Sequence, residues 1–489
     1  MESKTSDPTK KQHWLLFVIV ATWVCFAAFK DIQSLPIMDW DEARQGVNAY
    51  EMILNNDFIV HTYDGEVDTF NLKPPLSMWQ LVIGFWIFGF NKVGLRFFSA
   101  LFLVIITCHS MWFLKKNVNT YAALSVGVFL ALFGPRFMHL FGTGDPDALH
   151  LLLSYFACIC LYNAVTKDPK WMIGTGFLLG LDFLTKATHM ACLLAVVCLS
   201  LLVLNKQHHI RAKALLLYGL LPLLTPITAW ALTRYTADGS VFFSRMIEVD
   251  ILRRVSSVME GNSGGVLYYV QSTAWFLGLL ESMLLLAVIG SAIWIARKQQ
   301  LIIDKPLLVI FTLLAVVPFA LYTPVPTKLP WYVYPSILGL AIVFAYACQI
   351  LLTQYQAQTS KQKLVLLALP LVVAAVVIDP HISNALTQRN QHNPSIFSML
   401  NQTECSEYYC INLCGEEQPV QQSWLLEGYF YGYRHQPGDY QIFLGSNRSA
   451  LLLVEFDPTQ PEDLESLCGT EYEILVIYQS FAVLRYAGE

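Results

Sequence analysis

Long apolar segments constrain this chain more than any other feature of its sequence. A helix needs roughly 17–25 mainly apolar residues to cross a bilayer, and about eleven segments of the chain approach or reach that length. Only 14% of the residues are charged, well below the proportion typical of soluble domains. We therefore expect an α-helical polytopic membrane protein with about eleven spans. The predicted spans are 13–35, 93–114, 119–141, 146–165, 170–186, 187–205, 211–234, 267–296, 306–323, 331–352 and 363–379.

Basic residues lie in alternate connections between these segments, as they do in the cytoplasmic loops of membrane proteins. The pattern holds if the N-terminus is cytoplasmic, the first span is retained, and the short apolar segment 75–90 lies along the membrane surface. An odd number of crossings then places the tail outside. The predicted domains are a transmembrane domain at 1–379 and an extracytoplasmic soluble domain at 380–489. The predicted outer loops are 36–92, 142–146, 235–266 and 324–330.

The tail has the pattern of a small α/β domain. Short apolar or alternating runs, such as Ala450 to Phe456, are separated by turn residues such as Asp457-Pro458. Four cysteines in this polar region indicate disulfides and an oxidising compartment. A zinc site is the alternative, although the tail contains no Cys-x-x-Cys pair. The four cysteines are Cys405, Cys410, Cys414 and Cys468.

Carboxylates and cations are concentrated on the predicted outer loops. A carboxylate within hydrogen-bond reach can activate an acceptor hydroxyl as a general base. Lys and Arg stabilise the charge that develops on a leaving phosphate. Carboxylates and cations together at one membrane face predict the transfer of a group from a lipid-linked phosphate to an acceptor. The candidates are Asp39, Asp41, Glu42, Arg44 and Lys73 in the first loop, Asp145 and Asp147 in the second, Arg245, Glu248, Asp250, Arg253 and Arg254 in the third, and Lys328 and Tyr332 in the fourth.

Several motifs resemble those of known families. Asp41-Glu42-Ala43-Arg44, followed about thirty residues later by Lys73-Pro74-Pro75-Leu76, is similar to the start of the protein O-mannosyltransferase and aminoarabinose (lipid A) transferase families. These are integral-membrane glycosyltransferases of the C type. The resemblance covers residues 14–350. The further motifs are Gly144-Asp145-Pro146-Asp147-Ala148, Phe183-Leu184-Thr185-Lys186 and Lys328-Leu329-Pro330-Trp331-Tyr332-Val333-Tyr334-Pro335.

The resemblance implies inverting transfer of a sugar from a polyprenyl-phosphate donor. The acceptor would be a hydroxyl or phosphate of a protein, lipid A or a glycan. Asp41 maps to the proposed base, and Glu42 stands beside it. The functional acid of the second loop is Asp145 or Asp147, and the choice stays open. No cofactor, catalytic metal or nucleic acid is expected. Membrane lipids surround the protein, and the expected location is the bacterial inner membrane with the active site on the periplasmic side.

The resemblance also implies binding roles. The cations that would contact the donor phosphate are Arg44, Lys73, Arg253 and Lys328. The residues that would contact substrate are Asp39, Asp250 and Tyr332. Related chains often carry a Glu-His-x-x-Arg pattern in the third loop, whereas this chain has Val249-Asp250-Ile251-Leu252-Arg253 at that place. The missing histidine leaves the identity of the sugar or the acceptor open.

Simpler interpretations exist for several of these residues. Asp147 would also suit a helix N-terminus, and Lys73 would suit an interfacial lysine. Asp182 and Lys186 are four apart and would suit an ion pair within one helix. A transporter or flippase of a lipid-linked sugar is the alternative function, but it should place its charges near the bilayer midplane. A binding protein that uses the tail would leave Asp41 and Lys73 dispensable.

Overall fold

The computed structural model describes residues 8–134, 141–208, 212–259, 261–354, 396–400, 405–446, 450–460, 462, 464 and 471–487. These residues form two compact units, which we treat separately. The membrane unit contains the described parts of 1–32, 69–80 and 96–384. The second unit contains 33–68, 81–95 and the described parts of 385–489. The sequence assigned 33–68 and 81–95 to the transmembrane domain, whereas here they pack with the tail.

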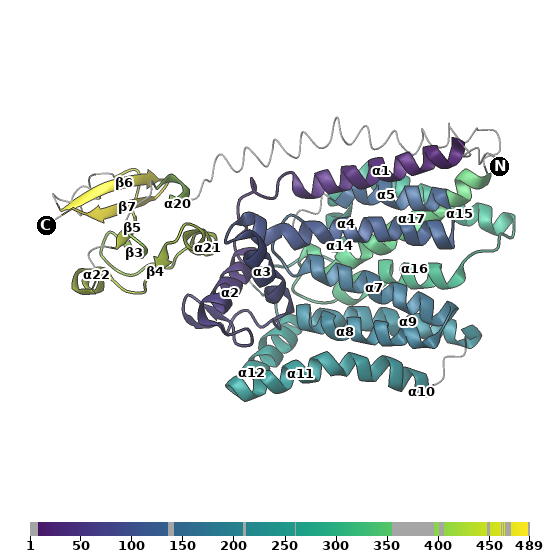
Figure 1. Cartoon of the computed structure of the whole chain (residues 1–489), viewed down its shortest axis with the longest axis horizontal. Helices are drawn as coiled ribbons and strands as arrows, with labels where there is room; N and C mark the ends of the chain where they lie inside the picture. Colours follow the sequence, from purple (N-terminus) through teal and green to yellow (C-terminus); the bar gives the residue numbers. More distant parts are fainter. Residues whose placement is uncertain are drawn as a thin grey trace, which may run out of the picture. The chain divides into compact units, whose positions relative to one another are not determined.

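Long helices lying side by side build the membrane unit (Figure 1). Seven helical segments in the described ranges are long and apolar enough to cross a membrane. The chain is therefore an integral membrane protein, as predicted. The long helices are α1 (Pro8–Phe29), α4 (Lys92–Asn117), α5 (Thr120–Phe133), α7 (Asp147–Thr166), α8 (Met172–Lys186), α9 (Met190–His208), α11 (Leu221–Asp238), α15 (Leu279–Lys298), α16 (Lys305–Tyr322) and α17 (Tyr334–Gln354).

The predicted spans and these helices agree closely, with two differences. Segment 211–234 contains α10 (Ala212–Ala214) and the π-helix η4 (Leu215–Leu220) before α11. Segment 267–296 is divided into α14 (Tyr268–Leu277) and α15 at Gly278, whose φ is +93°. Glycine adopts this conformation without a steric penalty, so the helix ends there. The predicted span 363–379 lies outside the described residues, and the count of eleven spans stays a prediction.

Helix starts and close helix contacts follow from local sequence. The Asp304 side chain accepts a hydrogen bond of 3.0 Å from the Leu307 amide and begins α16. Helix α7 is the most buried of the seven candidate spans. Gly176 lets α8 approach η4 closely, since a Cβ there would lie 2.0 Å from the Gly219 carbonyl oxygen. Small residues at such crossings are typical of membrane helices.

Short helical turns connect several of the membrane helices. The turn η3 (Ala187–His189) follows α8, and η6 (Pro330–Val333) precedes α17. The third predicted loop forms α12 (Val241–Met246), the π-helix η5 (Ile247–Arg253) and α13 (Arg254–Ser256). The turn η2 (Pro169–Trp171) lies between α7 and α8.

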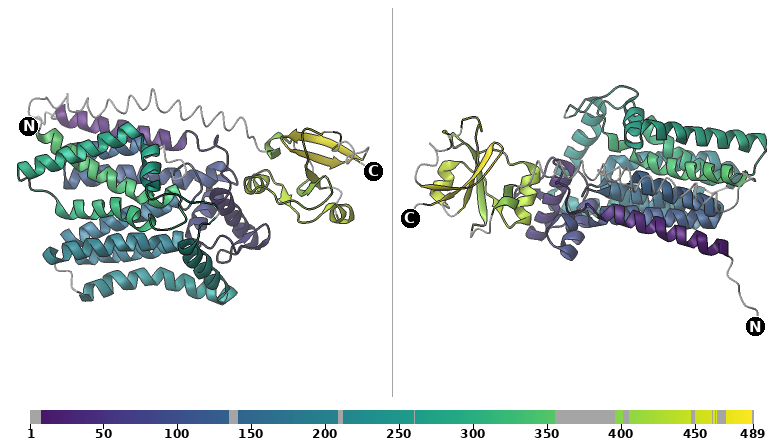
Figure 2. Two further views of the ribbon diagram at one scale, coloured as in Figure 1. Left: turned by 180° about the vertical axis from the view of Figure 1, so that it is seen from behind. Right: turned by 90° about the horizontal axis from the view of Figure 1, so that it is seen from above.

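The second unit combines the first predicted loop with the tail. Helix α2 (Asp41–Asn55) leads to a hairpin of β1 (Thr62–Tyr63) and β2 (Glu66–Val67). Helix α3 (Leu76–Phe88) runs from the membrane unit into this one. The rest is the C-terminal α/β region, by which we mean the described residues from Ile396 to Ala487 (Figure 2).

A five-stranded sheet forms the centre of the C-terminal α/β region, as predicted for the tail. Its strand order is β4-β3-β5-β7-β6, in which β3 is parallel to β4 and β5, and β7 is antiparallel to β5 and β6. Alternate residues of β3 and β5 enter two separate cores on opposite faces. The strands are β3 (Glu407–Asn412), β4 (Arg434–His435), β5 (Leu451–Glu455), β6 (Tyr472–Tyr478) and β7 (Phe481–Tyr486), and the helices are α20 (Ile396–Met399), α21 (Gln422–Phe430) and α22 (Tyr440–Ser446).

The structure leaves the pairing of the tail cysteines undecided. Cys410 is buried in β3 with a free thiol, and Cys414 is exposed with a free thiol. Burial raises the pKa of the Cys410 thiol to about 12, and the charges of Glu455 and Glu417 add to the shift. That thiol is therefore unreactive at neutral pH. Cys468 lies outside the described residues, so the predicted disulfide stays a prediction.

Candidate active site

The first acidic motif forms a tight turn at the start of α2. Trp40 precedes the helix with φ +70° and ψ −109°, a conformation that bulky residues rarely adopt. The Glu42 carboxylate accepts a hydrogen bond of 2.8 Å from the Met38 amide, which closes the turn. Asp41 is the first helical residue and is half-buried, whereas Glu42 is buried. Strained residues of this kind occur often at functional sites.

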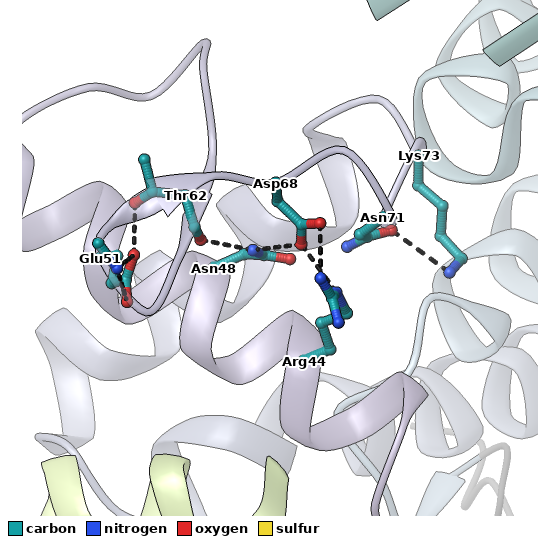
Figure 3. A network of polar contacts seen from close by, with 8 residues as sticks. Arg44, Asn48, Glu51, Thr62, Asp68, Asn71 and Lys73 are labelled. Atoms are coloured by element: carbon teal, nitrogen blue, oxygen red, sulfur yellow. Dashed lines mark hydrogen bonds and ion pairs between the residues drawn. The ribbon is translucent and has the colours of Figure 1, made fainter. Parts of the chain in front are cut away.

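Arg44 lies in a polar network that stabilises the same loop (Figure 3). Its guanidinium makes two hydrogen bonds to Asp68, of 2.9 and 2.8 Å, and stacks over the Tyr63 ring at 4.1 Å. The Asp68 side chain is fully buried, so it requires this compensating charge. Asn48 bridges Asp68 and the Thr62 carbonyl at 3.0 and 2.6 Å. Arg44 is thus bonded to residues of its own loop.

The network continues to Glu51 on α2. The Thr62 hydroxyl donates a hydrogen bond to one carboxylate oxygen, and the Tyr429 hydroxyl donates to the other at 2.9 Å. Burial raises the pKa of Glu51 above its usual value of 4.5, while these hydrogen bonds oppose the shift. No pattern in the sequence pointed to Glu51, Asn48 or Asp68, because their partners are distant along the chain.

In the membrane unit, two polar pairs join α7 to α8. Asp147 and Lys186 form an ion pair of 2.7 Å, and both side chains are buried. One turn along, the His150 ring nitrogen Nδ1 lies 2.6 Å from the Asp182 carboxylate. The predicted pair between Asp182 and Lys186 within α8 is therefore wrong. Both side chains point toward α7, where each finds a buried partner.

A cluster of cations and aromatic rings surrounds His189. Arg254 donates a hydrogen bond of 3.1 Å to the Tyr332 hydroxyl, and the His189 ring lies 4.7 Å from the Tyr332 ring. Lys186, Arg254 and Lys73 are close enough for their charges to act on His189. Asp250 holds the Arg254 guanidinium at 2.9 Å. Segments of the first, third and fourth predicted loops thus meet beside the end of α8.

The remaining predicted residues have other surroundings. Asp145 is fully buried and accepts a hydrogen bond of 2.8 Å from Thr143. The Lys328 ammonium donates to the carbonyls of Thr323 and Val325, at 2.5 and 2.8 Å. Arg253 is exposed and pairs with Glu248 at 2.6 Å. The arginine that joins the cluster is the neighbouring Arg254, another of the third-loop arginines expected near the donor phosphate.

Comparisons with known proteins agree with these observations. Residues 72–231 match the family model of dolichyl-phosphate-mannose-protein mannosyltransferases. An undecaprenyl phosphate-alpha-4-amino-4-deoxy-L-arabinose arabinosyl transferase of Proteus mirabilis is 25% identical over 67% of this chain and 58% of its own length. A transferase of the same description from Sodalis glossinidius is 25% identical over 62% of this chain and 54% of its own. The matches span less than two thirds of these relatives.

A solved structure decides the fold. ArnT from Cupriavidus metallidurans, in its complex with undecaprenyl phosphate, superimposes with a TM-score of 0.67 over 96% of this chain and 97% of that one, at 17% identity. Its apo form gives a TM-score of 0.65. The chain has the C-type membrane glycosyltransferase fold. The predicted resemblance to the protein O-mannosyltransferase and aminoarabinose transferase families is confirmed.

In a C-type fold, the His189 cluster has the composition of an anion site. It combines the cations Lys73, Lys186 and Arg254 with the hydroxyl of Tyr332. Two of these cations are paired with carboxylates: Lys186 with Asp147 at 2.7 Å and Arg254 with Asp250 at 2.9 Å. An arrangement of this kind can bind a phosphate and stabilise charge that develops on it.

Proposed function

We propose that this protein transfers a sugar, with inversion, from a polyprenyl-phosphate donor to a hydroxyl or phosphate acceptor at the outer face of a bacterial inner membrane. The His189 cluster is the observation that carries the proposal. Its residues come from separate segments of the chain, with Arg254 bonded to the Tyr332 hydroxyl and the Lys186 ammonium 5.9 Å from the centre of the Tyr332 ring. The fold is shared with a protein solved with undecaprenyl phosphate. The names of the relatives point to an isoprenyl phosphate as the donor lipid.

The cluster would bind the donor phosphate. Lys73 and Arg254 supply positive charge, and the Tyr332 hydroxyl supplies a further donor. Asp250 fixes the guanidinium of Arg254 in place, so its role is indirect. As the bond between the anomeric carbon and the phosphate oxygen breaks, negative charge grows on the phosphate. Cations already in position stabilise that charge more than they stabilise the donor.

Asp41 would act as the base. Its carboxylate takes the proton of an acceptor hydroxyl while the acceptor oxygen attacks the anomeric carbon from the face opposite the phosphate. Because the attack comes from that opposite face, the configuration inverts. The electron pair of the breaking bond leaves with the phosphate. Glu42, Asp145 and Asp147 remain candidate catalytic acids. Glu42 closes the turn, and Asp147 holds Lys186, so we assign both of them a supporting part.

The other predicted binding residues receive different weights. We propose that Arg44 orders the first loop through Asp68, and that Lys328 stabilises the turn before η6 through two carbonyls. Arg253 remains an exposed candidate for the phosphate as the lipid approaches. The acceptor class, whether lipid A, another glycan or a protein, and the sugar itself stay open, since the relatives differ in both.

The decisive experiment is sugar transfer by the purified protein in nanodiscs, with a radiolabelled polyprenyl-phosphate sugar and candidate acceptors. Lys73→Ala should weaken donor binding and slow turnover, because the phosphate is charged before and during the reaction. Lys298→Ala is the matched control, since Lys298 lies at the far end of α15 over Trp294. Movement of labelled lipid between leaflets without release of sugar would instead support the flippase.

A further inference from the structure

The turn before α2 is strained and held by contacts. Trp40 adopts a positive φ that costs a bulky residue on the order of 1–3 kcal/mol. The Ala43 amide bonds to the Met38 carbonyl at 3.1 Å, and the Arg44 amide to the Trp40 carbonyl at 2.9 Å. Such a conformation persists only where its surroundings impose it. One of those surroundings comes from the other end of the chain.

The C-terminal α/β region holds this turn directly. The backbone amide of Ser423, in the first turn of α21, donates a hydrogen bond of 2.8 Å to the Asp39 carboxylate. Amides in the first turn of a helix have no partner within the helix, and the helix dipole favours an anion there. Asp39 therefore binds α21 at one side of Trp40, while Asp41 begins α2 at the other side.

Three further contacts attach the first loop to the same region. Glu51 accepts from the Tyr429 hydroxyl at 2.9 Å, and the Tyr50 and Tyr429 rings stack with centroids 4.4 Å apart. The Asp64 carboxylate lies 2.8 Å from the His435 ring nitrogen Nδ1. The first two contacts bring α21 against the second half of α2, and the third joins the hairpin to β4.

The packing between α2 and α21 is close. A Cβ at Gly46 would lie 2.4 Å from a terminal carbon of Leu426, so only glycine fits without moving that side chain. Lys92, the first residue of α4, also pairs with Glu427 of α21 at 3.2 Å. The contacts of Asp39, Gly46 and Glu51 thus hold α2 against α21.

We propose that the C-terminal α/β region is a positioning element for the catalytic turn, acting through the hydrogen bond between the Ser423 amide and Asp39. The inference rests on the proposed function, in which Asp41 is the base. It gives Asp39 a positioning role in place of the substrate contact that the sequence suggested. Loss of the bond lets Trp40 relax and moves Asp41 out of alignment, which lowers turnover and leaves the donor site unchanged.

Ser423→Pro tests the bond at its donor, because proline removes the amide hydrogen and is tolerated in the first turn of a helix. Ser423→Ala keeps the amide, and Gln422→Pro places a proline at the preceding position while keeping the Ser423 amide. Asp39→Ala removes the acceptor, and Asp39→Asn keeps a carbonyl oxygen in its place. Thermal unfolding of each full-length variant identifies any that fold poorly.

We expect Ser423→Pro and Asp39→Ala to lower kcat by up to about 30-fold, with the KM for donor unchanged. Both controls and Asp39→Asn should retain activity, and the double variant should be no slower than the slower single one. Normal turnover in Ser423→Pro would overturn the proposal. If Asp39→Ala alone were slow, Asp39 would act on the substrate itself.

Hydrogen exchange separates this inference from the proposed function. The Ala43 and Arg44 amides are bonded within the turn and should exchange faster in Ser423→Pro and Asp39→Ala than in either control. This readout needs no substrate. If the wild-type protein transfers no sugar but these amides respond, the proposed function fails while the positioning contact stands. Unchanged exchange in both variants would contradict the positioning contact.

Discussion

At the scale of single residues, the acids near the candidate site differ in what surrounds them. Asp145, Asp147 and Asp182 are buried, and their partners are Thr143, Lys186 and His150 respectively. Asp41 is half-buried at a helix start, next to a strained residue. A base must be reachable by an acceptor. The partial exposure of Asp41 fits that requirement better than the burial of the other acids.

Asp41→Asn should therefore lower the single-turnover rate by about 10²–10⁴-fold with donor affinity little changed. The amide keeps the shape of the side chain but cannot take a proton. Glu66→Gln, at an exposed position of β2, is the control and should be active. An acceptor phosphate is already ionised and needs no base, so a much smaller effect would indicate such an acceptor or move the base to another acid.

Glu51 should make the second unit sensitive to pH. Its pKa is raised by burial, so between pH 4.5 and the raised value the folded unit keeps a proton that the unfolded chain releases. This contribution to stability is complete below pH 4.5 and is lost as the pH rises through that window. Hydrogen exchange of the α2 amides should therefore quicken with pH more than the intrinsic rate does. Glu51→Gln should flatten the dependence, and an equally steep profile in that variant would exclude Glu51 as its source.

Sequence identified the residues of the His189 cluster by type but not by contact. Lys73, Lys186 and Tyr332 stood in recognisable motifs, so they could be named in advance. Arg254 and Arg253 are adjacent, and only the path of η5 and α13 decides which one turns toward Tyr332. Asp68 belongs to no motif, and its pairing with Arg44 depends on the hairpin between them.

At the scale of elements, apolar run length predicted the helices because a membrane span must satisfy its own backbone. The pattern could not show how neighbouring helices exchange polar partners. Asp182 and Lys186 have the spacing of a pair within α8, yet α7 brings Asp147 and His150 opposite them. A buried charged side chain pairs with an oppositely charged group that lies in line with it and away from water. Helix packing decides which group that is.

The pair between α7 and α8 yields a prediction about stability. Lys186→Met leaves the Asp147 carboxylate buried without its cation, and this should destabilise the protein by about 3–5 kcal/mol. Adding Asp147→Leu should restore most of the unfolding midpoint, because no charge is then left unpaired. Lys170→Met in η2, an exposed position, is the control. Thermal unfolding in detergent measures all four proteins.

Restored stability in the double variant should not restore transfer, because the Lys186 cation beside the Tyr332 ring is gone. If the double variant were fully active, Lys186 would be only a structural partner of Asp147. If it were as unstable as Lys186→Met, the loss would come from packing rather than from an unpaired charge.

At the scale of the whole molecule, the first loop and the tail form one compact unit although more than 300 residues separate Asp39 from Ser423. Periodicity and composition report on neighbours along the chain, so they predicted the sheet of the tail but not its attachment to α2. The fold class could be predicted because bilayer thickness constrains each span separately. The attachment depends on contacts between distant segments, which a single sequence does not record.

The attachment sharpens the prediction of topology. Since α2 and the C-terminal α/β region share one unit, the first loop and the tail must lie on the same side of the membrane. The distribution of basic residues predicts that this side is outside and that the N-terminus is cytoplasmic. Alkaline phosphatase fused after Glu489 should be active in whole cells, and the same reporter fused after Lys116 or Lys298 should be inactive. A tail fusion reporting a cytoplasmic location would overturn the odd number of crossings, the outer site and the predicted disulfides together.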